Sequence, residues 1–181
     1  MSKQQAPDKA TRLVEIGRIT KAHGIRGEVR VVLHNAESTL VGEGRKLIVR
    51  PAPTIPVQAD RTLRVLRVRE APGALIVAFS EVSDRDQAEA LHGSGVLLRR
   101  DEFPPLDEGE FYACDVEGAE VFGPDGEKVG TTLALVDYPT CSVLRVQKLD
   151  QSIVEYPLVE AVIGSVDVAA GRVTLLDAEG L

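Results

Sequence analysis

Apolar and polar residues alternate over short stretches of the first hundred residues, and glycine, proline or charged residues separate the stretches. Alternation with a period of two is typical of β-strands that bury one face. We therefore expect strands at residues 12–20, 28–34, 46–50, 61–70, 74–80 and 95–100. Five or six short strands in half a chain are typical of a small β-barrel.

One segment of the first half has a helical pattern instead. Residues 83–93 begin with Ser83, which can cap a first turn, and end with Gly93, which can stop a helix. Ala88 and Leu91 would share one face of this helix. The pattern predicts a single short helix before the last strand of the first half.

Residues 101–109 interrupt the β pattern with two adjacent prolines and several acidic residues, and we expect a linker there. Beyond them, strand-like stretches alternate with turns at roughly ten-residue spacing, which favours a second small barrel or sandwich. The whole pattern predicts an all-β chain with one or two short helices. The first unit, at residues 12–100, would be a small β-barrel, and the second, at residues 110–181, a small barrel or sandwich.

The two halves differ in charge. Residues 1–100 hold 17 lysines and arginines against 11 acidic residues, a net charge of +6. Residues 101–181 hold 4 against 17, a net charge of −13. A basic unit favours contact with phosphates, whereas an acidic unit favours a basic protein partner or serves only solubility.

Several classes of protein do not fit the sequence. Cys114 and Cys141 form no C-x-x-C pair, so we expect neither a disulfide scaffold nor a zinc site. The chain has no run of about 18 apolar residues, and its first twelve residues are unlike a secretory signal. We find no metal-binding or catalytic motif. We therefore expect a cytoplasmic monomer without metal, cofactor or catalysis; an enzyme acting through His23 is a weaker alternative.

Five basic or titratable side chains flank the loop between the first two predicted strands: Arg18, Lys21, His23, Arg26 and Arg30. Gly24 and Gly27 can supply positive φ angles to this loop. One interpretation is an ordinary solvated hairpin. The other is a phosphate-binding tip, because glycines let the backbone approach an anion that lysine and arginine neutralise.

A second group of cations lies in residues 61–70, at positions 61, 64, 67 and 69. Strict alternation would place Arg64 on one face and the other three on the face that also holds Leu63 and Val65. We therefore expect the alternation to break at a bulge or a strand end. This strand is either an ordinary solvated barrel strand or part of a nucleic-acid-binding surface.

Phe111 and Tyr112 stand side by side where the acidic half begins. On an extended segment, neighbouring side chains point to opposite faces, so one aromatic ring could be buried and the other exposed. An exposed ring beside several carboxylates would suit a basic protein partner. Alternatively, the pair seals the junction between the two domains.

Taken together, these motifs resemble the ribosome maturation factor RimM family. "EIGRITKAHGIRGEVRV" is similar to the family's opening pattern, and "SDRDQAEALHG" to its N-domain helix. "EFYACDVEGAEV" resembles its entry to the second domain, and "LDAEGL" its closing segment. The resemblance spans residues 13–181, and the motifs occur in the family's order.

The resemblance implies two small β-barrels in tandem, a translation-factor-like N-terminal barrel followed by a PRC-barrel. It also implies a non-enzymatic assembly factor that acts on the head of the immature 30S ribosomal subunit and supports 16S rRNA processing. Phe111 and Tyr112 would contribute to binding ribosomal protein S19, and the first domain would lie toward 16S rRNA and neighbouring proteins of the head.

Two segments depart from the family pattern. Ala113 and Cys114 stand where a tryptophan is usual, and Ser142 follows "YPTC" where an acidic residue is common. PRC-type barrels also resemble a photosynthetic reaction-centre subunit. The alternative function is therefore a structural or interaction module of an electron-transport or membrane complex.

Overall fold

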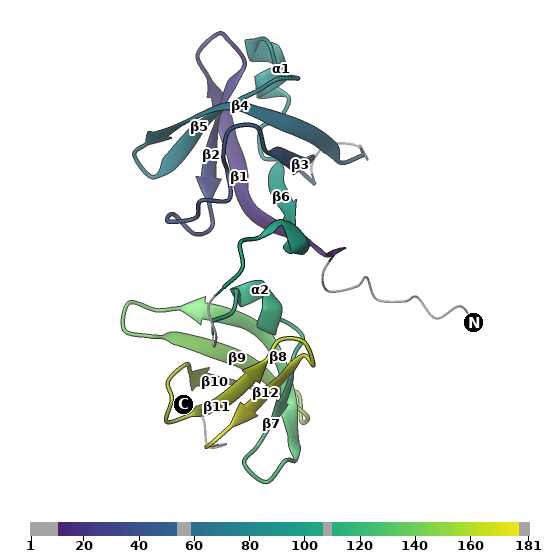
Figure 1. Ribbon diagram of the computed structural model, residues 1–181, viewed down its shortest axis with the longest axis vertical. Coiled ribbons are helices and arrows are strands. Elements are labelled where there is room, and N and C mark those ends of the chain that lie inside the picture. The colour runs from purple at the N-terminus through teal and green to yellow at the C-terminus, as the bar shows by residue number, and fades with distance from the viewer. Residues whose placement is uncertain (1–10, 54–58, 107–109, 178–181) are drawn as a thin grey trace, which may run out of the picture. The chain divides into compact units, whose positions relative to one another are not determined.

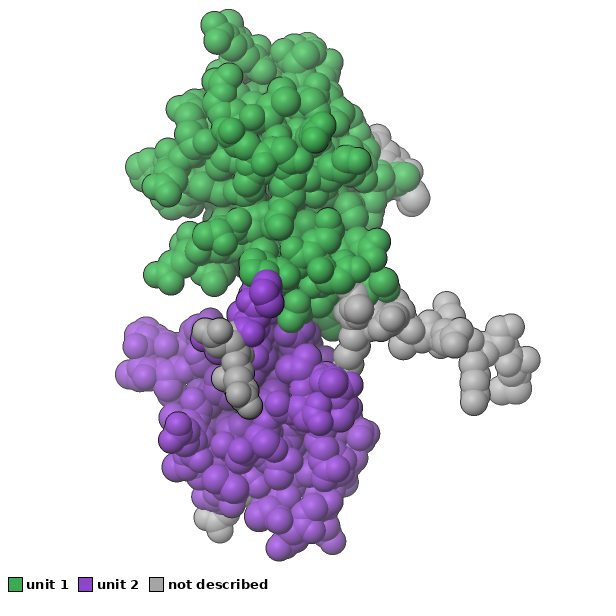
Figure 2. All heavy atoms as spheres, viewed as in Figure 1, with its two compact units in different colours: residues 1–104 green, residues 105–181 purple. Residues whose placement is uncertain are grey.

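The computed structural model describes residues 11–53, 59–106 and 110–177. The chain divides into two compact units, Met1–Pro104 (unit 1) and Pro105–Leu181 (unit 2) (Figure 2). The division falls within the predicted linker segment, of which residues 107–109 lie outside the described part. So do residues 178–181 of the closing motif.

Unit 1 is a closed six-stranded barrel (Figure 1). Its strand order is β1-β2-β5-β4-β3-β6, and every neighbouring pair is antiparallel. The strands are β1 (Leu13–His23), β2 (Glu28–Leu33), β3 (Lys46–Arg50), β4 (Arg61–Ala71), β5 (Ala74–Phe79) and β6 (Gly95–Arg99). All six lie where the alternation predicts them, and their ends differ from the predicted ends by at most three residues.

Strand β1 closes the barrel because it pairs with β2 on one side and β6 on the other. Its register shifts between Ile19 and Lys21 against β2, and between Glu15 and Gly17 against β6. Such bulges bend a strand and increase its twist, which a small barrel requires. Gly17 is needed at this bend, since a Cβ there would lie 2.6 Å from the carbonyl oxygen of Val32.

The inward face of the barrel strands forms one apolar core. Alternate residues supply it, as the side-chain period of a strand requires. Its fully buried members include Ile19, Val29, Val31, Leu63 and Phe79. Burying each such side chain contributes about 1.5–3 kcal/mol, so this core is the main source of the unit's stability.

Helix α1 (Arg85–Glu89) lies between β5 and β6 and is shorter than the sequence predicts. Its N-cap is Asp84, whose Oδ1 accepts a hydrogen bond from the backbone N–H of Gln87 at 2.9 Å. The prediction that Ser83 caps this helix is therefore wrong by one residue. A 3₁₀ turn, η2 (Arg100–Glu102), follows β6, so the first residues of the predicted linker are ordered structure.

Unit 2 combines a short helix with a six-stranded sheet (Figure 1). The sheet order is β10-β9-β8-β7-β12-β11; β7 and β12 are parallel, and the other neighbours are antiparallel. The elements are α2 (Ala113–Val116), β7 (Glu120–Phe122), β8 (Lys128–Asp137), β9 (Ser142–Lys148), β10 (Ile153–Pro157), β11 (Ile163–Asp167) and β12 (Arg172–Leu175).

The core of unit 2 is separate from that of unit 1. Tyr156 is its largest fully buried side chain, and Leu144, Val146, Val173 and Leu175 surround it within the same cluster. The predicted mostly-β fold with one or two short helices is confirmed. The predicted barrel of unit 1 is closed. In unit 2 the strand order begins at β10 and ends at β11 without a pairing between these two strands, so the predicted second barrel stays a prediction.

Candidate nucleic-acid and protein interfaces

Strands β1 and β2 form a hairpin whose four-residue turn runs from Gly24 to Gly27. Both glycines have positive φ, 67° and 78°, a region that residues with a Cβ rarely adopt. A Cβ on Gly27 would also lie 2.5 Å from the carbonyl oxygen of Val82, just before α1. The turn is thus fixed both by its own backbone and by this contact. We call residues 18–30 the basic hairpin.

The predicted cations of the basic hairpin lie on its outer face and its turn. Lys21 on β1 is directly opposite Arg30 on β2. Because the neighbouring Val29 is buried in the core, Lys21 and Arg30 point away from it. His23 lies two residues beyond Lys21 and therefore on the same face, and Arg26 is exposed on the turn. The fold brings these four side chains into one region.

Arg18 lies at the far end of the basic hairpin and is ion-paired. Its Nη2 donates to Oε1 of Glu15 at 2.9 Å, and His34 Nε2 lies 3.2 Å from the same oxygen. Burial alone would raise the pKa of Glu15, but the hydrogen bonds and charges of Arg18 and His34 outweigh it and lower this pKa. Arg18 is therefore the least available of the five predicted phosphate-binding residues.

The other cations of the basic hairpin have no carboxylate partner within the described part of the chain. Lys21 and Arg26 form no ion pair there, and a guanidinium nitrogen of Arg30 donates to the backbone oxygen of Pro72. The carboxylate of nearby Glu28 is engaged by Arg69 at 3.0 Å. No carboxylate among the described residues thus compensates the positive charges of Lys21 and Arg26.

Elsewhere in unit 1, several arginines are neutralised locally. The ion pairs are Arg50–Asp60 at 2.8 Å, Arg85–Glu89 at 2.7 Å and Arg99–Asp101 at 2.6 Å. Their positive charge is screened by a partner at hydrogen-bond distance. The net positive charge of unit 1 therefore does not spread evenly over its surface, and the basic hairpin is one place where it is exposed.

The predicted break in alternation on β4 is confirmed. The register against β5 shifts between Val65 and Arg67, with Leu66 as the extra residue. Arg67 and Arg69 alternate with the core residue Val68, so both point outward. The shift explains how a strand with four arginines keeps an apolar inner face, and it leaves Arg67 exposed to solvent.

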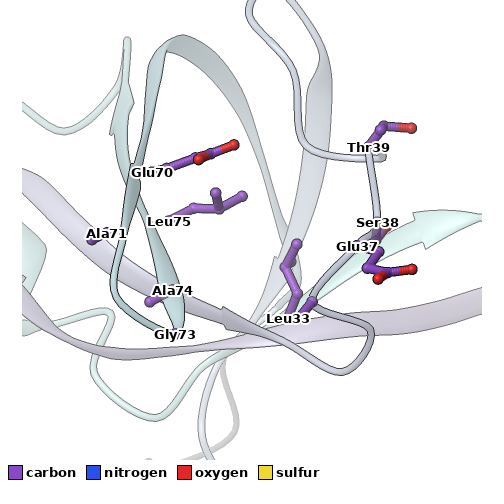
Figure 3. A pocket seen from close by; sticks show the side chains of 10 residues that line it. Leu33, Glu37, Ser38, Thr39, Glu70, Ala71, Gly73, Ala74 and Leu75 are labelled. Carbon is purple, nitrogen blue, oxygen red and sulfur yellow. The ribbon is translucent and has the colours of Figure 1, made fainter.

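A pocket of about 360 Å³ lies beside the turn between β4 and β5 (Figure 3). Residues 33–39 form one wall and residues 70–75 the other, and the carboxylates of Glu37 and Glu70 both line it. Two carboxylates repel an anion, so this pocket does not suit a phosphate. The pocket is therefore no part of the candidate phosphate-binding region, which is the basic hairpin.

Phe111 and Tyr112 immediately precede helix α2 rather than lying on a strand. Both side chains are half-buried, and Phe111 packs against the core of unit 2. Tyr112 is the N-cap residue, and its backbone N–H donates to the carboxylate of Asp115 at 3.1 Å. The predicted split into one buried and one exposed ring is wrong: both side chains are half-buried, and the pair precedes a helix instead of lying on a strand.

The second departure from the family pattern falls on the turn between β8 and β9. Ser142 donates its hydroxyl hydrogen bond to Asp137, and the backbone N–H of Tyr138 donates to the carbonyl oxygen of Cys141. These bonds close a short turn. An acidic side chain at position 142 would instead face the carboxylate of Asp137.

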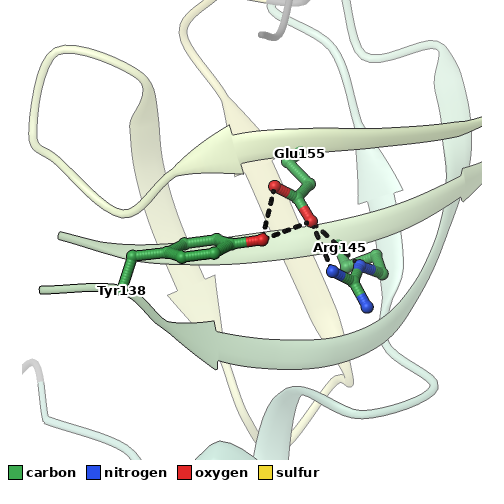
Figure 4. A network of polar contacts seen from close by, with 3 residues as sticks. All are labelled: Tyr138, Arg145 and Glu155. Carbon is green, nitrogen blue, oxygen red and sulfur yellow. Dashed lines mark hydrogen bonds and ion pairs between the residues drawn. The ribbon is translucent and has the colours of Figure 1, made fainter.

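Beside this turn lies a polar network that the sequence analysis did not find (Figure 4). The hydroxyl of Tyr138 donates to both carboxylate oxygens of Glu155 at 3.3 Å, and Arg145 donates to Glu155 Oε1 at 2.6 and 3.0 Å. The bond to Glu155 raises the pKa of Arg145. Arg145 and Glu155 face each other across β9 and β10, a pairing that depends on strand register.

Among the described residues, no group of three or more His, Cys, Asp or Glu side chains is arranged to hold a metal ion. In the same part of the chain, none of the helices has the length and apolar character needed to cross a membrane.

Several known proteins are similar to this chain. A family model described as the RimM N-terminal domain matches residues 14–103. A ribosome maturation factor RimM from Sorangium cellulosum is 41% identical over 172 residues, which cover 94% of this chain and 98% of that protein. One from Nitrobacter winogradskyi is 32% identical and covers 91% of each chain.

A solved structure was also found, that of a 16S ribosomal RNA processing protein RimM from Pseudomonas aeruginosa. It is 25% identical, covers 93% of this chain and 99% of its own, and superposes with a TM-score of 0.45. The sequence identity to the Sorangium protein over nearly its whole length assigns the family without this structure. The chain belongs to the ribosome maturation factor RimM family.

Proposed function

We propose that this protein is a ribosome maturation factor that acts by binding. Unit 1 contacts 16S rRNA through the basic hairpin, and unit 2 binds a basic ribosomal protein, S19, in the head of the immature 30S subunit. The observation that carries the proposal is the 41% identity to a protein named ribosome maturation factor RimM, over 98% of that protein. We also propose that this binding supports 16S rRNA processing.

The basic hairpin supports the part that concerns rRNA. Like charges directly opposite each other on neighbouring strands are destabilising, and Lys21 faces Arg30 in this way. An anion bound between them would relieve this repulsion. Arg26, exposed on the turn, and Arg67, exposed on β4, could bind further phosphates. Phosphate contacts of this kind position a protein on RNA irrespective of sequence.

Unit 2 supports the part that concerns the protein partner. Residues 105–181 hold 15 acidic residues against 4 basic ones, a net charge of −11. Within this unit, Tyr112 is half-buried and held by the bond between its backbone and Asp115. A partly exposed tyrosine fixed in place beside carboxylates is a typical anchor for a cationic protein surface.

Binding of both partners would explain how maturation is assisted without catalysis. Two linked binding units hold RNA and protein at a high effective concentration, so that the second contact forms within one complex. Stabilising one arrangement by binding disfavours the others. We propose that the protein acts in this way as a monomer in the cytoplasm.

Co-sedimentation with small subunits tests this function. The tagged protein should sediment with immature 30S subunits and much less with mature ones. Tyr112→Ala should weaken binding to purified S19 about 30-fold, since a tyrosine anchor contributes on the order of 2 kcal/mol. Tyr138→Ala is the matched control, because it removes the same side chain from the β8–β9 turn. Equal sedimentation with immature and mature subunits would contradict the function; equal affinities of the two variants would contradict the interface.

A further inference from the structure

The turn of the basic hairpin presents an isoleucine to solvent. Ile25 is 79% exposed, more than any other large apolar side chain in the described part of the chain. Tight turns favour glycine, asparagine, aspartate and serine, so a β-branched apolar residue is contrary to local preference. Exposure of this side chain does nothing for the stability of the barrel, which suggests a role in binding.

Two glycines shape the turn that carries this isoleucine. Gly24 and Gly27 on either side have positive φ, and the backbone of Gly27 lies against that of Val82. A β-branched side chain also has few rotamers. Little conformational entropy would therefore be lost when Ile25 is buried against a partner.

The surroundings of Ile25 indicate which kind of partner buries it. Arg26 follows it directly, and Lys21 lies on the adjoining end of β1. Neither cation is ion-paired within the described residues, so an apolar protein groove around the turn would have to bury uncompensated charge. A nucleic acid offers phosphates for the cations and apolar base faces for the isoleucine.

Unit 1 has no exposed phenylalanine, tyrosine or tryptophan ring in its described part that could stack on bases instead. Phe79 is 1% exposed and belongs to the core, and Phe103 is half-buried with the guanidinium of Arg100 over its ring. Leu66, at 58%, is the next most exposed large apolar residue of the unit, but it lies on the β4 bulge. Ile25 is thus the apolar group placed among the cations of the hairpin.

We infer that Ile25 is a wedge that enters between bases of rRNA while Lys21 and Arg26 bind the flanking phosphates. Apolar side chains inserted at a base step partly unstack it, and isoleucine is among the residues used for this purpose. Unpaired or weakly stacked nucleotides are the preferred target, because little stacking is lost. The inference rests on the proposed function, which makes rRNA the partner of unit 1.

Binding of the full chain to protein-free 16S rRNA, measured over a range of salt concentrations, tests the wedge. Ile25→Ser should weaken binding about ten-fold at every salt concentration, because it removes apolar burial and no charge. Ile25→Leu should stay within about three-fold of the wild type, and Leu66→Ser, the matched control, should have no effect. Lys21→Gln with Arg26→Gln should instead reduce the dependence on salt.

Chemical probing of the rRNA gives a second measure. The wild type and Ile25→Leu should expose one base, or two adjacent bases, to modification, and Ile25→Ser should not. Wild-type affinity of Ile25→Ser would overturn the wedge and leave the phosphate contacts standing. The wedge would also be overturned if Ile25→Ser lost affinity only for 30S subunits that carry their proteins. That result would place Ile25 against a ribosomal protein. Failure of the wild type to bind the rRNA would overturn the rRNA part of the proposed function, and the wedge with it.

Discussion

Unit 1 and unit 2 each enclose one apolar core with six strands, yet their charges are opposite: +4 over residues 1–104 and −11 over residues 105–181. The two units differ not only in net charge but also in how many of their charged side chains have an ion-pair partner in the described part of the chain. In unit 1, Arg50, Arg85 and Arg99 each have a carboxylate partner, whereas Lys21 and Arg26 have none among the described residues. We therefore expect the position of unpaired charge to matter more than net charge for the choice of partner.

The largest expected effect concerns the independence of the two cores. Phe79→Ala should lower the free energy of unfolding of unit 1 by about 3–5 kcal/mol, and Tyr156→Ala should do the same to unit 2, because each removes a fully buried ring. Hydrogen exchange of the full chain measures this unit by unit. Each variant should speed exchange in its own unit only. Faster exchange in both units would contradict two separately stable cores.

The next effect compares the two glycines of the basic hairpin. Gly24→Ala should cost about 1 kcal/mol, because its positive φ is unfavourable for alanine but its Cβ would meet no atom within 4 Å. Gly27→Ala should cost about 3 kcal/mol, since its Cβ would also overlap the carbonyl group of Val82. Urea unfolding measures both. Equal losses would mean that the contact with residue 82 does not hold the turn.

A smaller effect separates free from paired cations. Lys21→Gln with Arg26→Gln should weaken binding to 16S rRNA about ten-fold and lower the salt slope by about 2, one for each lost phosphate contact. The paired arginines supply the control, since Arg50→Gln with Arg85→Gln removes two charges that already have partners. If both double variants lose the same affinity, binding depends on the net charge of unit 1 and not on the hairpin.

The smallest effect concerns Glu15, whose pKa is lowered in the folded protein. A depressed carboxyl pKa contributes stability above the ordinary glutamate pKa, and this contribution is lost as pH falls through the folded value. Glu15→Gln should therefore cost less than about 1 kcal/mol at neutral pH and nothing in acid. Urea unfolding at both pH values measures it, with exposed Glu43→Gln as control. An equal loss at both pH values would exclude the ionic origin.

Much of the fold follows from the sequence because strands are local patterns. Alternation locates all six barrel strands, and the four arginines of residues 61–70 reveal the bulge on β4. Helix α2 has only four residues, too few for a helical period to be visible. The sequence pattern does not distinguish Ser83 from Asp84 as the N-cap of α1, since both residue types are good caps.

The parts of the site that the sequence did not predict depend on contacts between distant segments. The contact of Gly27 with Val82 and the network of Tyr138, Arg145 and Glu155 require the register of paired strands, which alternation alone does not define. The exposure of Ile25 likewise depends on the turn geometry. The cations of the basic hairpin could be identified, but not which of them have partners.

Ultraviolet crosslinking of the full chain to immature 30S subunits, followed by mass spectrometry of the adducts, tests the central claim most directly. The account predicts that RNA adducts fall on unit 1, at peptides of the basic hairpin that include Lys21 and Arg26. It predicts that chemical crosslinks to a basic ribosomal protein fall on unit 2, near Tyr112. RNA adducts concentrated on unit 2, with none on the basic hairpin, would contradict the division of binding between the two units.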